Sequence, residues 1–387
     1  MSVPYGLEAE QWNQLRERSK RLLPSERWWV NQQPFLLSRG YALRPRYHPD
    51  WIPTWELPGN EEIWPPRFED SLSTVGRGNV LDATRIADNV KVVLKIVRKW
   101  SDELTLTRHF GQKIRDDNPH NRCVTLLDVI YLSEPEQDII GIIVLPFLRE
   151  FDDPPFEQIG EVREALDQFL QGMEYLHINR VAHRDLCHGN LMMDGSRVIP
   201  KGWHFTAPYT HTGTVVGIDS EPRHTVFPVE YFIIDFGLSS MFPAHMSIDD
   251  AREIGRYGQD KTVPELSDTV SYNPFKVDIY QLGNVIMKLI ETYEGLEIFR
   301  ELAELMTSQN PNQRPTASEC VKFFRNLVLT MVDTTPVYHL SSSDSESDDG
   351  PLDSVSNEAP QSASEHDSGG SDLEERDSSL QERESSV

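Results

Sequence analysis

Apolar positions in the middle of the chain predict strands followed by a long helix. Two apolar segments, 80–86 and 92–97, are predicted to be strands joined by a turn at 87–89, where Asp and Asn are typical turn residues. The continuous apolar run at 139–145 is typical of a buried strand. Apolar residues three and four apart at 162–176 then predict an amphipathic helix. This part of the chain is therefore expected to pass from sheet to helix.

The N-terminal part of the chain is rich in tryptophan. Apolar positions among charges predict an amphipathic helix at 7–22 that ends at Pro24. Six of the eight tryptophans lie within the first 64 residues. Aromatic rings carry large burial energies and usually spend them on packing. Residues 1–69 are therefore expected to form an aromatic, Pro-rich extension that packs on the next part of the chain, with an aromatic ligand or partner groove as the alternative.

Charge and cysteine usage exclude several classes of function. The 387 residues include 37 Lys and Arg against 62 Asp and Glu, a net charge of -25. Nucleic-acid binding needs clustered basic residues, and an acidic surface is repelled by anionic membranes, so neither partner is expected. No apolar run approaches the about 20 residues of a membrane-spanning helix. The first residues lack a secretory signal, and three widely spaced cysteines fit a reducing compartment, so we expect an intracellular protein, cytoplasmic or nuclear.

The composition changes near the C-terminus. From Leu340 the chain consists mainly of Ser, Asp, Glu and Gly. Such a segment buries too little apolar surface to offset its chain entropy, so 336–387 is expected to be a disordered acidic tail. Ser341 and Ser345 each stand three residues before an acid, a pattern that acidophilic kinases favour. Solvated charge is the simpler interpretation, and a phosphorylated or basic-partner-binding tail is the alternative.

Two short polar motifs follow apolar segments between residues 181 and 238. The first is a His-Arg-Asp triplet at 183–185, with Asn190 five residues after its Asp. The second is Asp-Phe-Gly at 235–237, directly behind an apolar strand. Either triplet alone occurs by chance in loops. The two together, in this order, are a far more specific signal.

The pair of motifs resembles the catalytic loop and the metal-binding loop of eukaryotic protein kinases. The aromatic stretch and the pattern after it also resemble a fungal group of protein-kinase-like proteins. The resemblance implies an α+β protein with a two-lobed protein kinase-like fold. A small β-rich N-lobe is expected at 70–147 and a larger, mainly helical C-lobe at 148–335, with an insertion at about 195–230 for which a lid and a docking element are the functional alternatives.

The resemblance also implies the roles of the motif residues and the cofactors ATP and Mg²⁺. Phosphoryl transfer needs oxygen ligands for a hard cation and a carboxylate near the incoming hydroxyl. Asp235 and Asn190 are the implied metal ligands. Asp185 would orient the hydroxyl and accept its proton. Arg184, beside it, would receive a phosphate from the activation segment, for which Ser247 and Tyr257 are the best placed candidates.

The small lobe supplies the expected nucleotide-binding residues. Val-Val-Leu-Lys resembles the family's Val-Ala-Ile-Lys, so Lys95 would reach the α- and β-phosphates. Glu103, in the helix expected at 101–110, is its implied partner, and Asp102 is a competitor for that role. The phosphate-covering loop departs from the family pattern because the first two of its three glycines are missing.

Four further residues are expected to contact the nucleotide. Gly78 and Val80 fit the last Gly and the Val of the phosphate-covering loop. A hinge binds adenine through one carbonyl and one amide two residues later. Pro146 supplies the carbonyl and Leu148 the amide, so the proline costs no adenine hydrogen bond.

The large lobe both matches and departs from the family. Glu265 and Arg314 resemble the family's buried ion pair, and the helix expected at 276–286 carries the Asp that fixes the catalytic-loop backbone. Cys187 stands where Ser/Thr kinases have a Lys that touches the γ-phosphate. The Thr expected before the activation segment's end falls near Gln259 or its neighbour. Both departures leave the selection of the substrate hydroxyl open.

Three functions remain to be compared. The first is an ATP- and Mg²⁺-dependent protein kinase that acts on Ser/Thr hydroxyls of protein substrates. An upstream kinase acting on the activation segment or the acidic tail is a further candidate partner. The second is a pseudokinase scaffold or regulator with weak or no transfer, and the third is a small-molecule kinase, suggested by the sequence at 186–190.

Overall fold

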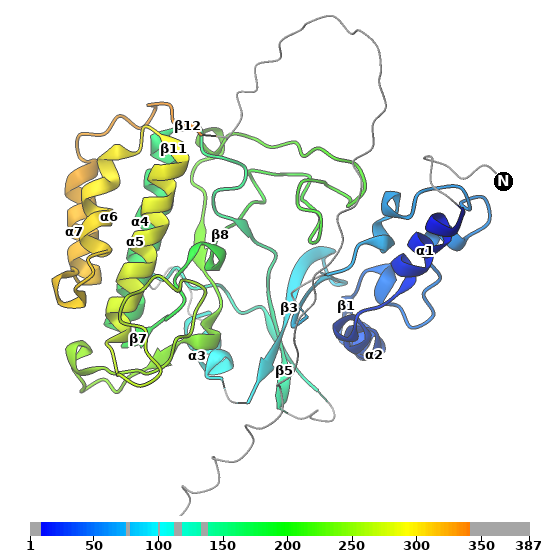
Figure 1. Ribbon diagram of the computed structural model, residues 1–387, viewed down its shortest axis with the longest axis horizontal. Coiled ribbons are helices and arrows are strands. Elements are labelled where there is room, and N and C mark those ends of the chain that lie inside the picture. Colours follow the sequence, from blue (N-terminus) through cyan, green and yellow to red (C-terminus); the bar gives the residue numbers. More distant parts are fainter. Residues whose placement is uncertain (1–8, 75–77, 100, 112–117, 133–137, 341–387) are drawn as a thin grey trace, which may run out of the picture. The chain divides into compact units, whose positions relative to one another are not determined.

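The computed structural model describes residues 9–74, 78–99, 101–111, 118–132 and 138–340. Part of the predicted phosphate-covering loop, at 75–77, and the predicted acidic tail after Leu340 lie outside these residues. A five-stranded antiparallel sheet forms the small lobe, in the order β1-β2-β3-β5-β4 (Figure 1). Its strands are β1 (Tyr41–Ala42), β2 (Val80–Arg85), β3 (Val90–Arg98), β4 (Asp128–Tyr131) and β5 (Ile139–Pro146).

The predicted strand pair and the predicted buried strand are present. β2 and β3 are joined by a tight turn in which Asn89 has a positive φ of 59°. This left-handed conformation is one that Asn tolerates better than most residues. β5 lies next to β3 in the sheet, so Lys95 is paired with Ile143 in the register. Helix α3 (Glu103–Gly111) follows β3 and largely coincides with the helix expected at 101–110.

The N-terminal segment contributes to the small-lobe sheet. The predicted helix at 7–22 is α1 (Ala9–Lys20), and a second helix, α2 (Pro24–Ser38), begins at the proline that was expected to end the first. Proline suits the first turn of a helix because its missing N–H has no partner there. Trp29 of α2 is 1% exposed and belongs to one apolar cluster with Leu81 of β2. Edge strand β1 follows α2, so residues within 1–69 complete the sheet.

Residues 43–79 connect β1 to its neighbour β2. Four single-turn 3₁₀ helices occur in this connection, at Pro45–Tyr47, Thr54–Glu56, Pro65–Arg67 and Glu69–Ser71. Arg46 is buried there and its Nε lies 2.8 Å from Glu26 Oε1 of α2. An ion pair without solvent must be well hydrogen-bonded to be tolerated. The connection is therefore anchored to α2 rather than forming a short hairpin.

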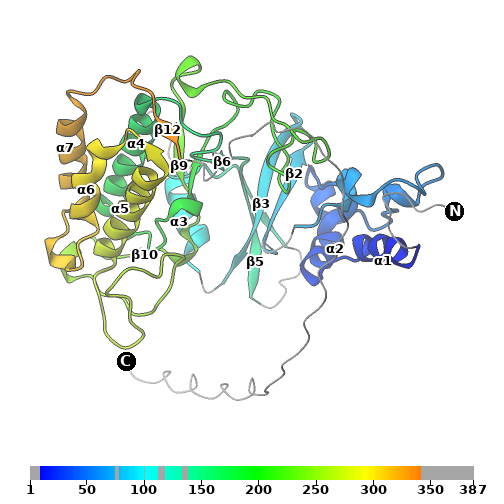
Figure 2. The ribbon, with the colours of Figure 1, turned by 45° about the horizontal axis from the view of Figure 1, so that its top comes forward.

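The large lobe is mainly helical (Figure 2). Its helices are α4 (Ile159–Ile178), α5 (Pro274–Thr292), α6 (Arg300–Met306) and α7 (Ala317–Val328). The helices predicted at 162–176 and 276–286 correspond to α4 and α5. Short strands lie next to the loops of the site: β6 (Arg149–Glu150), β7 (Val181–Ala182), β8 (Leu191–Met193), β9 (Tyr231–Ile233) and β10 (Ser240–Met241). Two more, β11 (Tyr293–Glu294) and β12 (Tyr338–His339), pair with each other in a separate sheet. Within the described residues, no helix is both long and apolar enough to cross a membrane.

Candidate active site

Lys95 stands between two carboxylates that come from different parts of the chain. Its Nζ lies 2.5 Å from Glu103 Oε1 of α3 and 2.6 Å from Asp235 Oδ1. The expected pair of Lys95 with Glu103 is thus present, whereas Asp102 is exposed. β3 holds the lysine in register, and the first turn of α3 presents Glu103 toward it. The small lobe and the Asp-Phe-Gly loop are therefore joined through one ammonium group.

The pKa values of this cluster follow from burial and charge. Burial by itself would lower the pKa of Lys95, but the charges of Glu103 and Asp235 raise it above its ordinary value. Burial would raise the pKa of Asp235, but the charge and hydrogen bond of Lys95 lower it. Lys95 is therefore cationic and Asp235 anionic at neutral pH. A phosphate group and a divalent cation would each find an opposite charge here.

A single buried carboxylate of α5 fixes the catalytic loop. Asp278 is 0% exposed and accepts hydrogen bonds from the main-chain amides of His183, at 2.8 Å, and Arg184, at 2.6 Å. It also lies 2.9 Å from Nε2 of His177. The loop needs such support because Arg184 has a φ of 69°, in the left-handed region that non-glycine residues rarely adopt. Asp278 has the backbone-fixing position implied by the sequence.

Asp185 is surrounded by neutral hydrogen-bond donors. Asn190 Nδ2 donates to Asp185 Oδ2 at 3.0 Å. Gln259 of the activation segment donates from its main chain to Oδ1 at 2.7 Å and from its side chain to Oδ2 at 3.3 Å. Gly258 has a φ of 86°, and a Cβ there would lie 2.9 Å from the carbonyl oxygen of Arg184. The glycine therefore lets the segment approach the catalytic loop.

Cys187 supplies no positive charge beside Asp185. Burial, together with the negative charge of Asp185, raises the pKa of the Cys187 thiol to about 12. The side chain is therefore a neutral thiol at physiological pH. A cation at this point would stabilise negative charge on a transferred phosphoryl group. This structure places a thiol and the amide of Gln259 near the carboxylate instead.

Arg184 is held by the activation segment. Its Nη1 donates to Ser240 Oγ at 2.9 Å and lies 3.5 Å from Glu253 Oε2. Its guanidinium carbon lies 5.6 Å from the centre of the Tyr257 ring. Sequence analysis favoured Ser247 and Tyr257 as phosphate carriers and did not single out Glu253. No short motif marks Glu253, because its approach to Arg184 depends on the path of the segment.

The two expected metal ligands have suitable chemistry. Asp235 follows β9 with a φ of 66°, and its Oδ1 accepts a hydrogen bond from the Gly237 amide at 3.1 Å. Asn190 Nδ2 is directed at Asp185, which leaves the amide oxygen as the available ligand atom. Mg²⁺ is usually bound by one or two protein oxygens together with substrate phosphates. Among the residues that the structure describes, no group of three His, Cys, Asp or Glu side chains could hold a metal ion.

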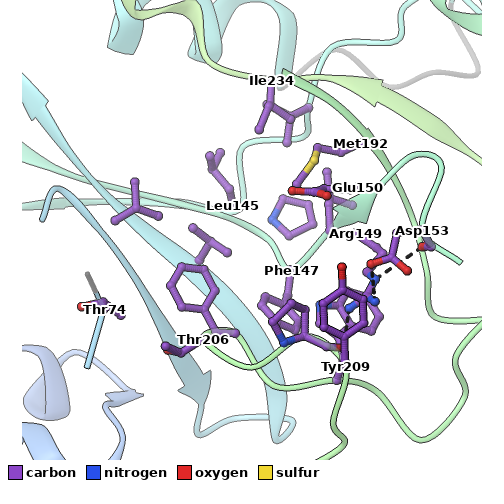
Figure 3. Close-up of a pocket in the computed structure, with 18 residues that line it drawn as sticks. Thr74, Leu145, Phe147, Arg149, Glu150, Asp153, Met192, Thr206, Tyr209 and Ile234 are labelled. Carbon is purple, nitrogen blue, oxygen red and sulfur yellow. Dashed lines mark hydrogen bonds and ion pairs between the residues drawn. The ribbon is translucent and has the colours of Figure 1, made fainter. Parts of the chain in front are cut away.

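A cavity of about 390 Å³ lies beside these groups (Figure 3). Its apolar lining includes Val80 of β2, Leu145 of β5, Met192 of β8 and Ile234, the residue before Asp235. Pro146, Phe147 and Leu148 also line it. Small-molecule sites commonly have volumes of about 300 to 1,000 Å³ and mostly apolar walls. Of the expected nucleotide residues, Val80, Pro146 and Leu148 thus border one cavity.

Comparison with known proteins identifies the family. The family model described as "Protein kinase domain" matches residues 70–300, which is more than half of the chain. The chain belongs to the protein kinase family. Its β-rich small lobe and helical large lobe are the two lobes of the α+β kinase fold.

Three curated kinases are similar to parts of this kinase domain. Cyclin-dependent kinase 2 of Caenorhabditis elegans is 31% identical over 33% of this chain and 38% of its own length. Serine/threonine-protein kinase Doa of Drosophila melanogaster is 24% identical over 59% of this chain and 26% of its own. Cyclin-dependent kinase 1 of Encephalitozoon cuniculi is 25% identical over 55% of this chain and 79% of its own. The chain thus covers less than half of the first two relatives.

One solved structure is also similar, the Rad53 kinase domain with SCD2. It is 18% identical, covers 67% of this chain and 89% of its own, and has a TM-score of 0.40.

The ion pair expected in the large lobe of the kinase domain is present. Arg314 lies 2.5 Å from Glu265 Oε1 through Nη1 and 2.8 Å from Oε2 through Nη2. The Arg314 side chain is fully buried and also donates to the carbonyl oxygens of Ser308 and Lys276. A two-pronged contact of this kind matches the planar geometry of guanidinium and carboxylate.

Gly78 contacts the N-terminal helix α2. A Cβ at Gly78 would lie 2.7 Å from the Cβ of Ser25. The Gly78 carbonyl oxygen accepts a hydrogen bond from Trp29 Nε1 at 3.1 Å. The absence of a side chain at Gly78 therefore allows close packing on α2, a role that sequence analysis did not anticipate.

Sequence analysis also missed five residues of the insertion that line the cavity of the kinase domain. These residues are Trp203, Phe205, Thr206, Pro208 and Tyr209. Three aromatic rings within seven residues were the signal that could have pointed to them. Their position in the cavity wall depends on the path of the insertion beside the hinge, which the sequence does not show.

Proposed function

We propose that this chain is an ATP- and Mg²⁺-dependent protein kinase that transfers the γ-phosphoryl group to Ser or Thr hydroxyls of protein substrates. The observation that carries the proposal is the contact of Lys95 with both Glu103 and Asp235 beside the cavity. In this proposal Lys95 binds the nucleotide phosphates, and Glu103 orients Lys95. Family membership supports the reaction class.

The polar groups divide the chemical work. Asp235 and Asn190 would hold Mg²⁺, which would neutralise charge on the phosphates when bound. Asp185 would orient the substrate hydroxyl and accept its proton. Asn190, through its amide N–H, would keep that carboxylate in position. Because such a reaction depends on positioning and charge, these contacts matter more than a covalent step.

The cavity suits adenine on the apolar side. Val80 and Met192 would cover the faces of a flat ring, and the hinge would bind its edge through the carbonyl of Pro146 and the amide of Leu148. Gly78 is a weaker candidate for nucleotide contact because it packs closely on Ser25. The part of the phosphate-covering loop at 75–77 lies outside the described residues.

A pseudokinase is the second candidate, and a specific observation favours it. Cys187 replaces a cation near Asp185, and Gln259 donates to both oxygens of that carboxylate. A substrate hydroxyl would have to displace the side-chain amide of Gln259. Against this candidate stand Lys95 and Asp235, whose charges a scaffold does not require. In the proposed kinase, the substrate hydroxyl therefore replaces the side-chain amide of Gln259 at the Asp185 carboxylate.

A small-molecule kinase is supported less well. The pair of Glu265 with Arg314 is a feature that the sequence resemblance associates with protein substrates. An upstream kinase that modifies the activation segment stays part of the proposal, with Ser240 joining Ser247 and Tyr257 as candidates because it contacts Arg184. The similarity to a fungal group stays a prediction.

The direct test measures transfer. Purified protein would be incubated with labelled ATP and Mg²⁺ in the presence of generic protein substrates. We expect transfer to Ser and Thr that is lost on chelation of Mg²⁺ and in Asp185→Asn. Asp50→Asn, at an exposed position in the 43–79 connection, is the matched control and should retain activity.

Two further outcomes separate the candidates. Nucleotide binding without transfer to any protein would favour the pseudokinase. In that case Cys187→Lys combined with Gln259→Thr should create measurable transfer, because it would restore a cation and a short hydroxyl at the carboxylate. Transfer that persists at wild-type rate in Asp185→Asn would contradict the assigned role of Asp185.

A further inference from the structure

Part of the insertion crosses from one lobe to the other at the hinge. We call residues 203–213 the hinge strap. On the small-lobe side, Lys91 Nζ of β3 donates to the carbonyl oxygen of Trp203 at 2.7 Å. Arg44 Nη2, in the connection after β1, donates to Thr206 Oγ1 at 3.1 Å. Two separate groups of the small lobe thus hold the strap.

A third small-lobe contact involves a histidine of the strap. His204 Nε2 lies 3.0 Å from Glu69 Oε1, and Arg44 Nη1 lies 3.0 Å from the same oxygen. His204 is 4% exposed and the Glu69 side chain is 26% exposed, so the contact is partly shielded from solvent. A hydrogen bond to a charged group is worth more than a neutral one, especially where water is excluded. Glu69 therefore joins the strap and Arg44 in one network.

The large lobe holds the strap through a buried arginine. Arg149 of β6 is 2% exposed, and its Nη1 donates to the carbonyl oxygen of Pro208 at 2.7 Å. Its guanidinium carbon lies 5.5 Å from the centre of the Trp203 ring. Gly195, just after β8, leaves room for that ring, since a Cβ there would lie 2.9 Å from it. These contacts are on the opposite side of the hinge from Lys91.

The strap also covers the hinge itself. The rings of Phe147 and Trp203 are stacked, with centroids 4.9 Å apart and planes 20° apart. Lys91 Nζ lies 5.6 Å from the centre of the Phe147 ring, so the cation, the hinge ring and the strap ring form one cluster. Aromatic pairs and cation–π contacts both add to the stability of packing. The strap is therefore held to the hinge as well as to both lobes.

The strap and the apolar pocket share one cavity. Figure 3 shows Thr206 and Tyr209 around the same space as Leu145 and Met192. The strap thus forms the hinge-side wall of the cavity that we propose for adenine. A ligand that enters or leaves on this side must pass the strap.

Kinase-type lobes exchange ligands by hinge opening, which separates groups on either side of the hinge. Such opening would stretch a segment bonded to both lobes. Hydrogen bonds to Lys91 and Arg44 must therefore break before the mouth can widen. These contacts involve side-chain tips rather than a continuous core, so they can break while the domain stays folded.

We infer that the hinge strap is a gate of the nucleotide pocket, which must release Lys91 and Arg44 before nucleotide can enter or leave. The inference rests on the proposed nucleotide site. In its bonded state the gate slows both entry and exit. Loss of a gate contact therefore raises the rates of both entry and exit. Loss of an ordinary contact to the ligand raises only the rate of exit.

The test measures both rate constants of Mg²⁺·ADP in full-length protein. Release of labelled ADP into excess unlabelled ADP gives the dissociation rate, and rapid filtration after mixing gives the association rate. Lys91→Met removes the donor to Trp203 and keeps the aliphatic stem, while Thr206→Val removes the acceptor of Arg44. Lys99→Met, at an exposed lysine just beyond β3, is the matched control.

We expect each strap variant to raise both rate constants about fivefold, the effect of one lost hydrogen bond, and to change Kd by less than twofold. The control should match wild type. Unchanged rates in both strap variants, or a faster exit with unchanged entry, would overturn the gate. ADP binding by Lys91→Met but not by wild type would support a gate that is closed at rest. If neither wild type nor any variant binds ADP, the proposed nucleotide site is wrong, and so is the inference of a gate.

Discussion

The catalytic loop and the hinge-side mouth of the cavity are built in opposite ways. In the catalytic loop, the polar groups lie within one short motif, and Asp278 holds the amides of His183 and Arg184. At the mouth, the partners are distant in sequence, as with Arg44 and Thr206, which are 162 residues apart. A site can be recognised from sequence where its groups share a loop. Where distant loops assemble it, only the path of the chain reveals it.

The two regions also differ in the strength of their support. The contacts of the catalytic loop centre on a carboxylate without solvent exposure, whose loss would leave several donors unpaired. The contacts at the mouth are several separate hydrogen bonds and ring contacts, each worth about 0.5 to 1.5 kcal/mol. A substitution that removes the buried carboxylate is therefore expected to abolish the function of the catalytic loop. The second region is expected to change by degrees.

The largest effect is expected for a substitution of Asp235. Asp235→Asn keeps the size of the side chain and removes the charge that Lys95 and the proposed Mg²⁺ need. We expect kcat to fall by at least about 10²-fold, because charge stabilisation in a shielded site is lost. The fold should remain, as judged by an unchanged circular dichroism spectrum. Asp250→Asn, at an exposed position in the activation segment, is the control. A wild-type rate in Asp235→Asn would refute the metal-loop assignment.

The next largest effect is expected at the buried ion pair of the large lobe. Arg314→Met leaves Glu265 without its partner and should lower the free energy of unfolding by about 3 to 5 kcal/mol, measured by urea denaturation. The double variant Arg314→Met/Glu265→Leu removes the unpaired charge as well. It should recover part of the loss. A double variant no more stable than the single one would mean that the lost contacts of Arg314 to Ser308 and Lys276 dominate.

In the small lobe, Gly78→Ala should have a graded effect. The new Cβ would crowd Ser25, so we expect a loss of about 1 to 3 kcal/mol in stability. Ser25→Gly should relieve the crowding, so a double-mutant cycle should give a favourable coupling energy. Because Gly78 packs on α2, the KM for ATP should change by less than about threefold. A large rise in KM with unchanged stability would instead assign Gly78 to phosphate binding.

The smallest effect is expected at Glu164. Its Oε1 accepts a hydrogen bond at 3.2 Å from the amide of Val229, near the C-terminal end of the insertion. Burial raises the pKa of Glu164 from 4.5 to about 7. The protonated form is therefore favoured in the folded state. Its contribution to stability is full below about pH 4.5 and is lost as the pH rises through about 7.

Glu164→Gln mimics the protonated form at every pH. Its Tm relative to wild type should therefore rise between pH 5 and pH 8, by about 2 °C after allowance for solvent screening. Glu174→Gln, on the same helix, is the matched control. A difference that is independent of pH would contradict the raised pKa.

Local patterns predicted several elements of the fold. The strand pair β2–β3 was predicted from two apolar segments and a turn that includes Asn89, whose positive φ suits that residue, and strand β5 from a continuous apolar run. Helix α2 was not predicted, because Pro24 was taken as the end of a helix although it also suits the first turn of one. The edge strand β1 has only two residues, too few to form a pattern.

The sequence by itself was enough to propose the chemistry of the catalytic loop. The proposal came from the resemblance of the motifs that carry Asp185, Asn190 and Asp235 to those of protein kinases, and the family match supports that class. Short-range spacing carries this information because a loop brings its own residues together. Burial and charge then set the pKa values of Lys95 and Asp235, which depend on segments 140 residues apart.

Tertiary structure decided how the cavity is closed. The contact of Gly78 with Ser25, the approach of Gln259 to Asp185 and the path of the hinge strap were not readable from sequence. In each case the partner is chosen by the packing of a loop against a distant element, and many loop paths are compatible with the same local pattern. Only the folded chain selects one of them, because the burial of Trp203 and the hydrogen bonds of Lys91 form together in that path.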